Sequence, residues 1–214
     1  MPSYNIAFDS VYNKIKNRAF VPVMVGPESA NIPTFVTFAN NDLANNSNCG
    51  MYAYHPYDVS SSTLATTINS SLQSIGSFST KPNLMTEFSD NLDWFSTALF
   101  IQKALLYAKT SGYIYWKLTW NTPNSGTDAA IISVASANSS SAYTVTPFYY
   151  LIKHFSKYVD QGYHCITASS SNTSSSLITT AFVDPTSNQL TVVIVNNGEQ
   201  TKADFKATGK TIVP

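Results

Sequence analysis

Short apolar runs and segments of helical spacing follow one another through the first three quarters of the chain. Continuous apolar runs, typical of buried parallel strands, occur at 20–25, 49–54, 84–86 and 113–118. Apolar residues recur at helical spacing over 4–18, 32–45, 61–75 and 147–158, and over a segment that begins at Asp90 and stops before Gly112. This alternation predicts an α/β domain of parallel strands joined by helical crossovers.

The last quarter of the chain has a different pattern. Apolar and polar residues alternate there, which predicts strands at 177–183, 190–195 and 203–205. Turn residues separate these segments at Asp184-Pro185 and at Asn196-Asn197-Gly198, as in antiparallel hairpins. We place the boundary near Gln161-Gly162, which gives one domain at 1–160 and an all-β domain at 161–214.

Composition narrows the function classes. Only 11% of the 214 residues are charged and the formal net charge is +0, with no Lys/Arg run, so a basic face for nucleic acid is not expected. No apolar run is long enough to span a membrane. Abundant hydroxyl and amide side chains suit a protein that works on carbohydrate.

Targeting signals are mixed. No basic head and apolar core follow Met1, so no signal peptide is expected in this chain. Asn-x-Ser/Thr sequons are nevertheless compatible with a secreted glycoprotein, and they occur at Asn45, Asn69, Asn138 and Asn172.

Metal and cofactor chemistry finds no support in the sequence. Cys49 and Cys165 are too few and too far apart for a zinc site, and each is expected to be a buried or incidental thiol, with a mutual disulfide as the alternative. The chain has no Gly-rich phosphate loop, no Gly-x-Ser-x-Gly elbow and no metal-ligand spacing. We expect no cofactor and no metal, which leaves carboxylate chemistry as the catalytic hypothesis.

Conspicuous polar or aromatic residues stand where each predicted strand ends: Glu28, His55, Glu87 and Trp116. In parallel sheets and barrels the chemistry lies at the carboxyl ends of the strands. The sequence therefore predicts that these side chains share one site.

Glu87 and Glu28 also have structural interpretations. An acid such as Glu87 before a helix is favourable by roughly 0.3–1 kcal/mol against the helix dipole, but Asp90 is better placed for that role. For Glu28, in Gly-Pro-Glu-Ser, we favour a cap of the following helix.

The aromatic residues at the strand ends leave similar alternatives. His55 lies near Tyr57 and could be a structural histidine. Trp116 could pack in the core or form a platform on which a sugar ring stacks, and Trp120 is the weaker candidate for such a platform.

Several stretches resemble glycoside hydrolase family 30. Leu84-Met85-Thr86-Glu87 resembles its strand-seven motif, and Tyr54-His55-Pro56-Tyr57 resembles the end of its strand six. Further similarities, in family order, are Val25-Gly26-Pro27-Glu28-Ser29-Ala30-Asn31 to the strand-five turn, Tyr113-Ile114-Tyr115-Trp116 to strand eight, 147–158 to the last barrel helix and Gly162-Tyr163 to the passage into the β-domain.

The resemblance implies a fold and an activity. The fold would be the C-terminal half, strands five to eight, of a (β/α)8 TIM barrel, followed by part of an all-β sandwich. The activity would be that of a secreted retaining β-glycosidase, endo-β-1,4-xylanase-like, in which Glu87 attacks the sugar and forms a covalent glycosyl-enzyme. His55, Tyr57 and Trp116 would contact a β-linked polysaccharide. The 117–121 segment lacks the arginine with which some members grip a uronate.

The sequence departs from the family at one point. The acid/base glutamate belongs to an Asn-Glu-Pro motif at the end of strand four, and no Asn-Glu-Pro occurs here. A complete barrel also needs about 250 residues before any side domain. Three explanations stay open: a fragment of a longer enzyme, a missing N-terminal barrel half supplied by another chain or copy, or a defective remnant.

Two other functions remain alternatives. The chain could be a non-catalytic carbohydrate-binding fragment that uses His55 and Trp116, or a structural surface domain with neither property. Glu87→Gln separates catalysis from binding, because it should abolish turnover and leave sugar affinity largely intact.

Overall fold

The computed structural model describes residues 3–78, 80–89, 91–121, 129–135, 143–169 and 177–199, together with 204 and 206. Its first part contains α1 (Tyr4–Ile15), β1 (Met24–Ser29), α2 (Ile32–Phe38), a π-helical turn η1 (Ala39–Leu43), β2 (Cys49–Tyr54), α3 (Ser61–Thr66), α4 (Ile68–Gly76), β3 (Asn83–Phe88), α5 (Trp94–Tyr107) and β4 (Thr110–Tyr115). The second part contains β5 (Thr119–Asn121), β6 (Ile132–Val134), β7 (Tyr143–Val145), α6 (Pro147–Ser156), β8 (His164–Ile166), β9 (Leu177–Val183) and β10 (Leu190–Asn196).

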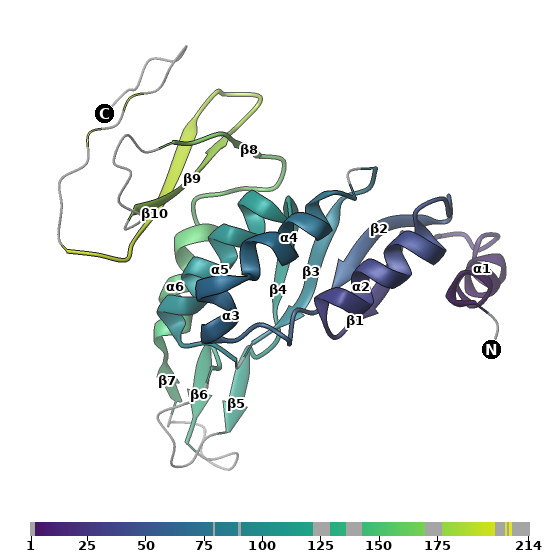
Figure 1. Ribbon diagram of the computed structural model, residues 1–214, viewed down its shortest axis with the longest axis horizontal. Helices are drawn as coiled ribbons and strands as arrows, with labels where there is room; N and C mark the ends of the chain where they lie inside the picture. The colour runs from purple at the N-terminus through teal and green to yellow at the C-terminus, as the bar shows by residue number, and fades with distance from the viewer. Residues whose placement is uncertain are drawn as a thin grey trace.

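A four-stranded parallel sheet forms the centre of the molecule, in the order β1-β2-β3-β4 (Figure 1). The predicted alternation of strand and helix is confirmed, and the chain is of the α/β kind. The prediction of half a TIM barrel is wrong, because the sheet is open and, over the described residues, β1 and β4 each have one unpaired edge. Periodicity reports which segments are strands and helices, but sheet curvature and closure depend on long-range pairing that it does not encode.

The C-terminal region is also simpler than predicted. Strands β8, β9 and β10 form one antiparallel sheet in the order β10-β9-β8, and the described residues place no second sheet against it as a sandwich requires. A third small sheet, β5-β6-β7, lies beyond the carboxyl end of β4 (Figure 1). No apolar pattern predicted these three strands, because each is only three residues long.

The helices that follow the strands form one layer. Consecutive members pack against one another, α2 on α4, α4 on α5 and α5 on α6, and the layer covers one face of the parallel sheet (Figure 1). Side chains from both layers meet in the core, among them Phe35, Tyr54, Met85, Phe88 and Phe100, all at most 1% exposed. Alternation along β3 and β4 then directs Leu84 and Ile114 to the other face, where Ile114 is 60% exposed.

Helix α5 begins later than its predicted start at Asp90, which lies outside the described residues. Its N-cap is Asp93, whose carboxylate accepts hydrogen bonds from the backbone N–H of Phe95 and Ser96, each at 3.0 Å. The helix also ends before Gly112, which belongs to β4. The turn from helix to strand is made by Lys109, whose φ is 52°.

Buried amides join the layers. Asn83, at the start of β3, donates to the carbonyl of Ile75 at 3.4 Å and to that of Ala108 at 3.0 Å, so one side chain binds the ends of two helices. Gln102 in α5 is fully buried and donates to the carbonyls of Ile178 in β9 and Val193 in β10, each at 3.1 Å. Gln102 thereby connects the helical layer to the C-terminal sheet.

Another strand prediction is corrected. The strand predicted at 20–25 begins at Met24, and Phe20 is 81% exposed and Val23 63% exposed, because Pro22 interrupts the run.

The two cysteines are free thiols, Cys49 buried and Cys165 exposed. This agrees with the expectation of buried or incidental thiols and contradicts the alternative of a mutual disulfide.

The predicted strand at 203–205 falls mostly outside the described residues. Among the helices that are described, none is long and apolar enough to cross a membrane.

Candidate functional site

The carboxyl ends of β1, β2 and β3 bring together the three residues that the sequence singles out there: Glu28, His55 and Glu87. Both acids lie at breaks in the strand register. In β1, Pro27 pairs with Ala53 and Ser29 with Tyr54, so Glu28 is left out of the ladder. In β3, Met85 pairs with Tyr113 and Phe88 with Tyr115, so Glu87 lies within a similar shift. Such irregularities re-aim side chains and are frequent beside active sites.

Glu28 does not cap the following helix, contrary to the interpretation favoured from the sequence. Asn31 is the N-cap of α2, and its side chain accepts the backbone N–H of Thr34 at 2.9 Å. Glu28 instead has a φ of 57°, which is uncommon for a residue with a side chain. Its Oε2 accepts hydrogen bonds from Thr86 Oγ1 at 2.6 Å and from His55 Nε2 at 2.5 Å.

His55 lies between the two acids. Its Nε2 contacts Glu28, while its Nδ1 lies 3.8 Å from Glu87 Oε2, a distance suited to an ion pair but too long for a hydrogen bond. The side chains are 17% exposed for His55, 24% for Glu87 and 38% for Glu28, so solvent reaches all three. His55 is therefore part of a charged cluster and not of the apolar core.

Glu87 has a second partner in Tyr57, which the sequence also assigned to the site. The phenol of Tyr57 donates to Glu87 Oε1 at 2.8 Å. Tyr57 is itself held by Asn91, whose side-chain amide donates to the Tyr57 carbonyl at 2.7 Å. The carboxylate of Glu87 is thus oriented by a hydroxyl on one oxygen and faces an imidazole with the other.

A neighbouring tyrosine supports the strand end from the core side. Tyr113 donates its phenol hydrogen to the carbonyl of Phe88 at 2.9 Å. Phe88 is the residue that follows Glu87 in the sequence. Burial holds the pKa of Tyr113 well above its ordinary value, with smaller contributions from nearby tyrosines. Tyr113 is therefore uncharged near pH 7, because burial raises its pKa, and it keeps the hydrogen that it donates to Phe88.

The two acids are linked through one side chain. A retaining glycosidase needs a second carboxyl group about 5–5.5 Å from its nucleophile. Glu28 and Glu87 contact the two nitrogens of one imidazole ring, at 2.5 and 3.8 Å. Because Glu28 Oε2 also accepts a hydrogen bond from Thr86, this carboxylate is held by both His55 and Thr86.

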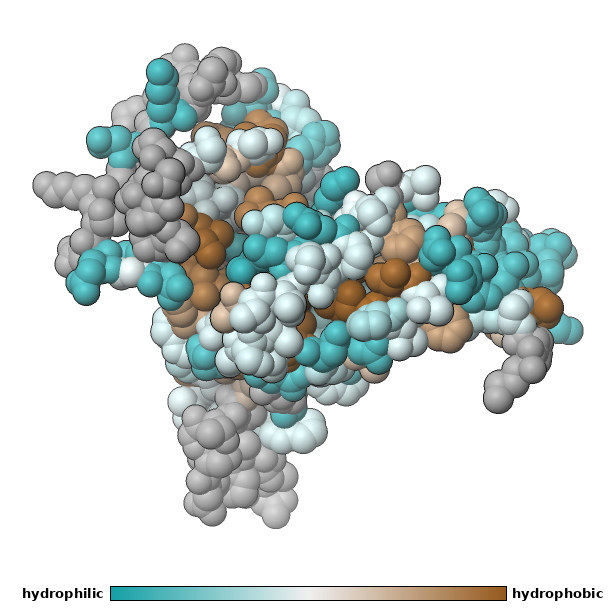
Figure 2. Space-filling view, in the orientation of Figure 1, coloured by the Kyte–Doolittle hydropathy of each residue, from teal (hydrophilic) through white to brown (hydrophobic). Residues whose placement is uncertain are grey.

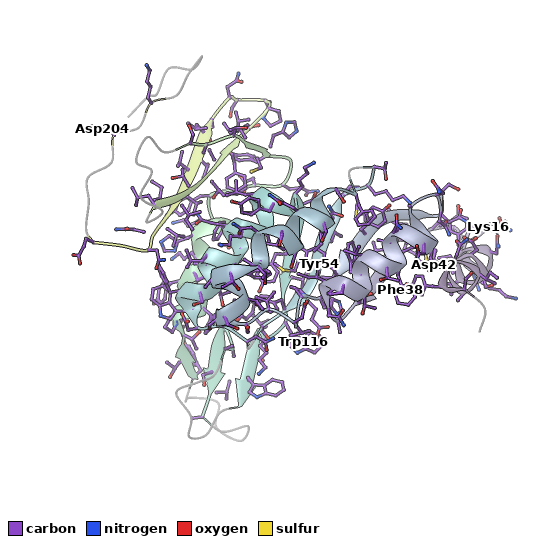
Figure 3. All side chains as sticks on the ribbon, viewed as in Figure 1. Lys16, Phe38, Asp42, Tyr54, Trp116 and Asp204 are labelled. Carbon is purple, nitrogen blue, oxygen red and sulfur yellow. The ribbon has the colours of Figure 1, made fainter. Side chains whose placement is uncertain are left out.

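Trp116 lies beyond the end of β4 and is 56% exposed (Figure 3). Its backbone N–H reaches the Phe88 carbonyl at 3.4 Å, which keeps the chain at position 116 close to the end of β3. The exposed ring rules out a core role for Trp116. Trp120 is 49% exposed, and the Lys117 ammonium lies 4.5 Å from the centre of its ring.

Sequence reasoning missed Thr86, Asn91 and the contact between Glu28 and His55. Alternation along β3 could have identified Thr86. Side chains two positions apart in a strand share one face, so Thr86 lies on the same open face of the sheet as Leu84. Nothing in the sequence signals the other contacts, which depend on the positive φ of Glu28 and on the path of the loop after β3.

A cavity of different character lies elsewhere. It has a volume of about 510 Å³, and its walls are mostly apolar side chains of α5, α6 and β10, including Phe95, Leu151 and Val195. In Figure 2 a hydrophobic patch is visible in this area, where the helical layer meets the C-terminal sheet. No acid lines this cavity, so it offers no carboxylate chemistry. No group of three or more His, Cys, Asp or Glu side chains arranged to hold a metal ion occurs in the described part of the chain.

Comparison with known proteins identifies a fold but no family. No family model and no curated protein matches the chain. A crystal structure of a conserved exported protein from Bacteroides fragilis is similar, with a TM-score of 0.59 and 16% identity over 73% of this chain. The match spans 37% of that longer chain. At this identity the similarity shows a shared α/β arrangement and nothing about activity.

Proposed function

We propose that this chain carries the nucleophile of a retaining β-glycosidase that acts on a β-linked plant cell-wall polysaccharide of the xylan type. Glu87 is the nucleophile, and His55, Tyr57 and Trp116 contact the sugar. The observation that carries the proposal is the setting of Glu87: a partly exposed carboxylate at a register break, at the carboxyl end of a parallel strand, with one oxygen hydrogen-bonded to Tyr57.

The chemistry follows from that setting. Oε2 of Glu87, the oxygen that Tyr57 does not bind, attacks the anomeric carbon, the bond from that carbon to the leaving oxygen breaks, and a glycosyl ester forms on Glu87. The Tyr57 hydroxyl holds Oε1, so the reactive oxygen keeps one orientation. The exposed face of Trp116 offers a surface on which an apolar sugar face can stack.

The resemblance of the segment around Glu87 to glycoside hydrolase family 30 supports the same assignment of roles. The exported protein with a similar fold accords with an extracellular place of action, which we include in the proposal. With ordinary substrates the leaving oxygen needs a proton from a second carboxylic acid, which the family keeps in a motif that this sequence lacks.

A test that does not need the acid uses a substrate with an activated leaving group. A 2,4-dinitrophenyl 2-deoxy-2-fluoro-β-xyloside releases a phenolate that requires no protonation, and the fluorine slows hydrolysis of the ester. We expect a stable adduct on Glu87, detected by intact mass and located by peptide mapping. Glu87→Gln should abolish labelling, whereas the matched control Glu199→Gln, at an exposed acid outside the cluster, should leave it unchanged.

A non-catalytic carbohydrate-binding function is the second candidate, because the sequence lacks the family's Asn-Glu-Pro acid motif and Trp116 is exposed. In that case the reagent leaves Glu87 unlabelled, while xylo-oligosaccharides bind and Trp116→Ala weakens their binding by about 1 kcal/mol or more. A chain that neither reacts with the reagent nor binds any β-linked oligosaccharide would contradict both functions.

A further inference from the structure

Two glycosylation sequons lie in the part of the chain that the structure describes, Asn45-Asn46-Ser47 and Asn69-Ser70-Ser71, while those at Asn138 and Asn172 lie outside it. A glycan is attached to an Asn-x-Ser/Thr sequence on the surface, because the oligosaccharide is bulky and hydrophilic. The sequence alone does not distinguish the two described sequons, but the fold gives them different settings.

Asn45 lies in the turn that joins η1 to β2. The residue between the two ends of the sequon anchors this turn: Asn46 is 8% exposed, it donates to Asp9 Oδ1 at 2.9 Å, and its carbonyl accepts from Lys81 Nζ at 2.7 Å. Asn45 and Ser47, the two side chains that define the sequon, are exposed on either side of this anchor. The turn therefore presents the sequon to solvent, and modification of Asn45 leaves the anchoring bonds intact.

Asn69 lies within α4 and is half-buried. Its Oδ1 accepts a hydrogen bond from Lys103 Nζ of α5 at 3.0 Å, where the two helices pack against each other. The hydroxyl of Ser71 is turned back to the Thr67 carbonyl, at 3.4 Å. A glycan on Asn69 would have to displace Lys103 and enter the contact between α4 and α5, so folding and glycosylation oppose each other at this sequon.

The turn also offers polar groups to a first sugar. Asn45 lines a hollow of about 250 Å³, whose other walls are amide, hydroxyl and carboxylate side chains of α1, η1 and the turn, including Asn5, Asp9 and Asp42. Such side chains bond the hydroxyl and acetamido groups of an N-acetylglucosamine. The turn precedes β2 and His55 follows it, so the hollow and the candidate site lie at opposite ends of the same strand. A glycan here leaves the candidate site open.

We propose that Asn45 is the attachment site of an N-linked glycan and that the fold keeps Asn69 unmodified. The amide nitrogen of Asn45 bonds to C1 of an N-acetylglucosamine that is carried on a lipid pyrophosphate. The bond from C1 to the pyrophosphate oxygen breaks, the pyrophosphate leaves with the electron pair, and the amide proton passes to the transferase. The inference rests on the extracellular place of action that the proposed function includes, and not on the role of Glu87.

The experiment is expression of the full chain behind a cleavable secretion leader in a eukaryotic host. No Lys or Arg lies between Arg18 and Lys81, so chymotrypsin is used to separate the two sequons. Removal of the glycan by a peptide N-glycosidase in heavy-oxygen water converts the modified Asn to a labelled Asp, which peptide mass identifies. We expect this label at Asn45 and none at Asn69.

Two matched variants locate the modification. Ser47→Ala removes the sequon but leaves Asn45 in place, so the label at this position should be lost. Ser71→Ala, which removes the same hydroxyl from the other sequon, should leave the label at Asn45 unchanged. An unmodified Asn45 in the secreted wild-type chain, or a modified Asn69, overturns the inference.

A third variant tests whether the fold protects Asn69. Ile75→Asp places a charge at a core position of α4 that is 0% exposed, and should prevent this helix from packing. Asn69 should then be labelled in the intracellular pool of the variant, and its remaining unlabelled would contradict protection by the fold. Failure of the fluorinated xyloside to react with Glu87 leaves all of these results unchanged, so the inference and the proposed function fail separately.

Discussion

The helix-covered face of the parallel sheet and its carboxyl edge are built from the same strands but are stabilised differently. On the covered face, aromatic side chains such as Phe88 and Phe100 pack with ring centres 4.9 Å apart and no exposure. At the carboxyl edge, Glu28, His55 and Glu87 are partly exposed, and the two acids lie at register breaks. The comparison shows that stability and chemistry are divided between two surfaces of one sheet, so that mutations at the edge can alter reactivity with little cost to folding.

The sharpest way to test this division is to remove a large side chain from each surface. Phe100→Ala should lower the free energy of unfolding by about 3–5 kcal/mol, because it leaves a cavity among buried aromatic rings. Trp116→Ala removes a larger ring that is 56% exposed and should change stability by only about 0.5 kcal/mol. Urea unfolding followed by circular dichroism measures both. Equal losses would mean that Trp116 belongs to the core.

A smaller effect is expected for the two asparagines that donate to backbone carbonyls on these surfaces. Asn83→Ala leaves the buried carbonyls of Ile75 and Ala108 without their donor and should cost about 2 kcal/mol. Asn91→Ala removes one bond to Tyr57 at an exposed position and should cost about 0.5 kcal/mol. Thermal unfolding of the two variants side by side provides the measurement. A larger loss for Asn91 would place a stabilising contact at the carboxyl edge.

The smallest effect is expected where the two surfaces meet, at the start of α5. Asp93→Ala removes the N-cap and should cost about 1 kcal/mol, while Asp160→Ala, at an exposed acid outside any helix, should be nearly neutral.

The contribution of Asp93 should also depend on pH. Hydrogen bonds from the side chain and backbone of Ser96 and from the backbone of Phe95 lower its pKa. Its contribution is therefore full above the unfolded value of about 3.9 and is lost as the pH falls through the lower folded value. Chemical unfolding between pH 7 and pH 2 should show the free energies of unfolding of the wild-type chain and of Asp93→Ala becoming equal at the acid end. A difference that stays constant with pH would contradict the capping role of Asp93.

Much of the covered face could be predicted from the sequence. Apolar runs and helical spacing correctly located β2, β3 and most of α5, because burial imposes those periods on the chain. The meeting of Glu28, His55 and Glu87 was also predictable, since parallel strands end at a common edge.

Other features were not accessible to pattern reasoning. The open sheet, in place of half a barrel, depends on pairing at strand edges, on which side-chain periodicity carries no information. The cap at Asp93 and the role of Glu28 were missed because several neighbouring polar residues could cap each helix. Only the backbone geometry shows which of these residues is the cap. The late start of β1 was missed because Phe20 and Val23 read as core residues although Pro22 lies between them.

The bond network of Gln102 has a mechanical consequence. The side-chain amide of Gln102, in α5, donates hydrogen bonds to two adjacent strands of the C-terminal sheet, at the carbonyls of Ile178 and Val193. A load applied at the end of β10 would therefore be transmitted through this amide to α5 as well as through the strand-to-strand bonds. In a single-molecule pulling experiment the hydrogen bonds of the C-terminal hairpin would not break one after another. The hairpin would unfold in one step, when the hydrogen bonds of Gln102 break.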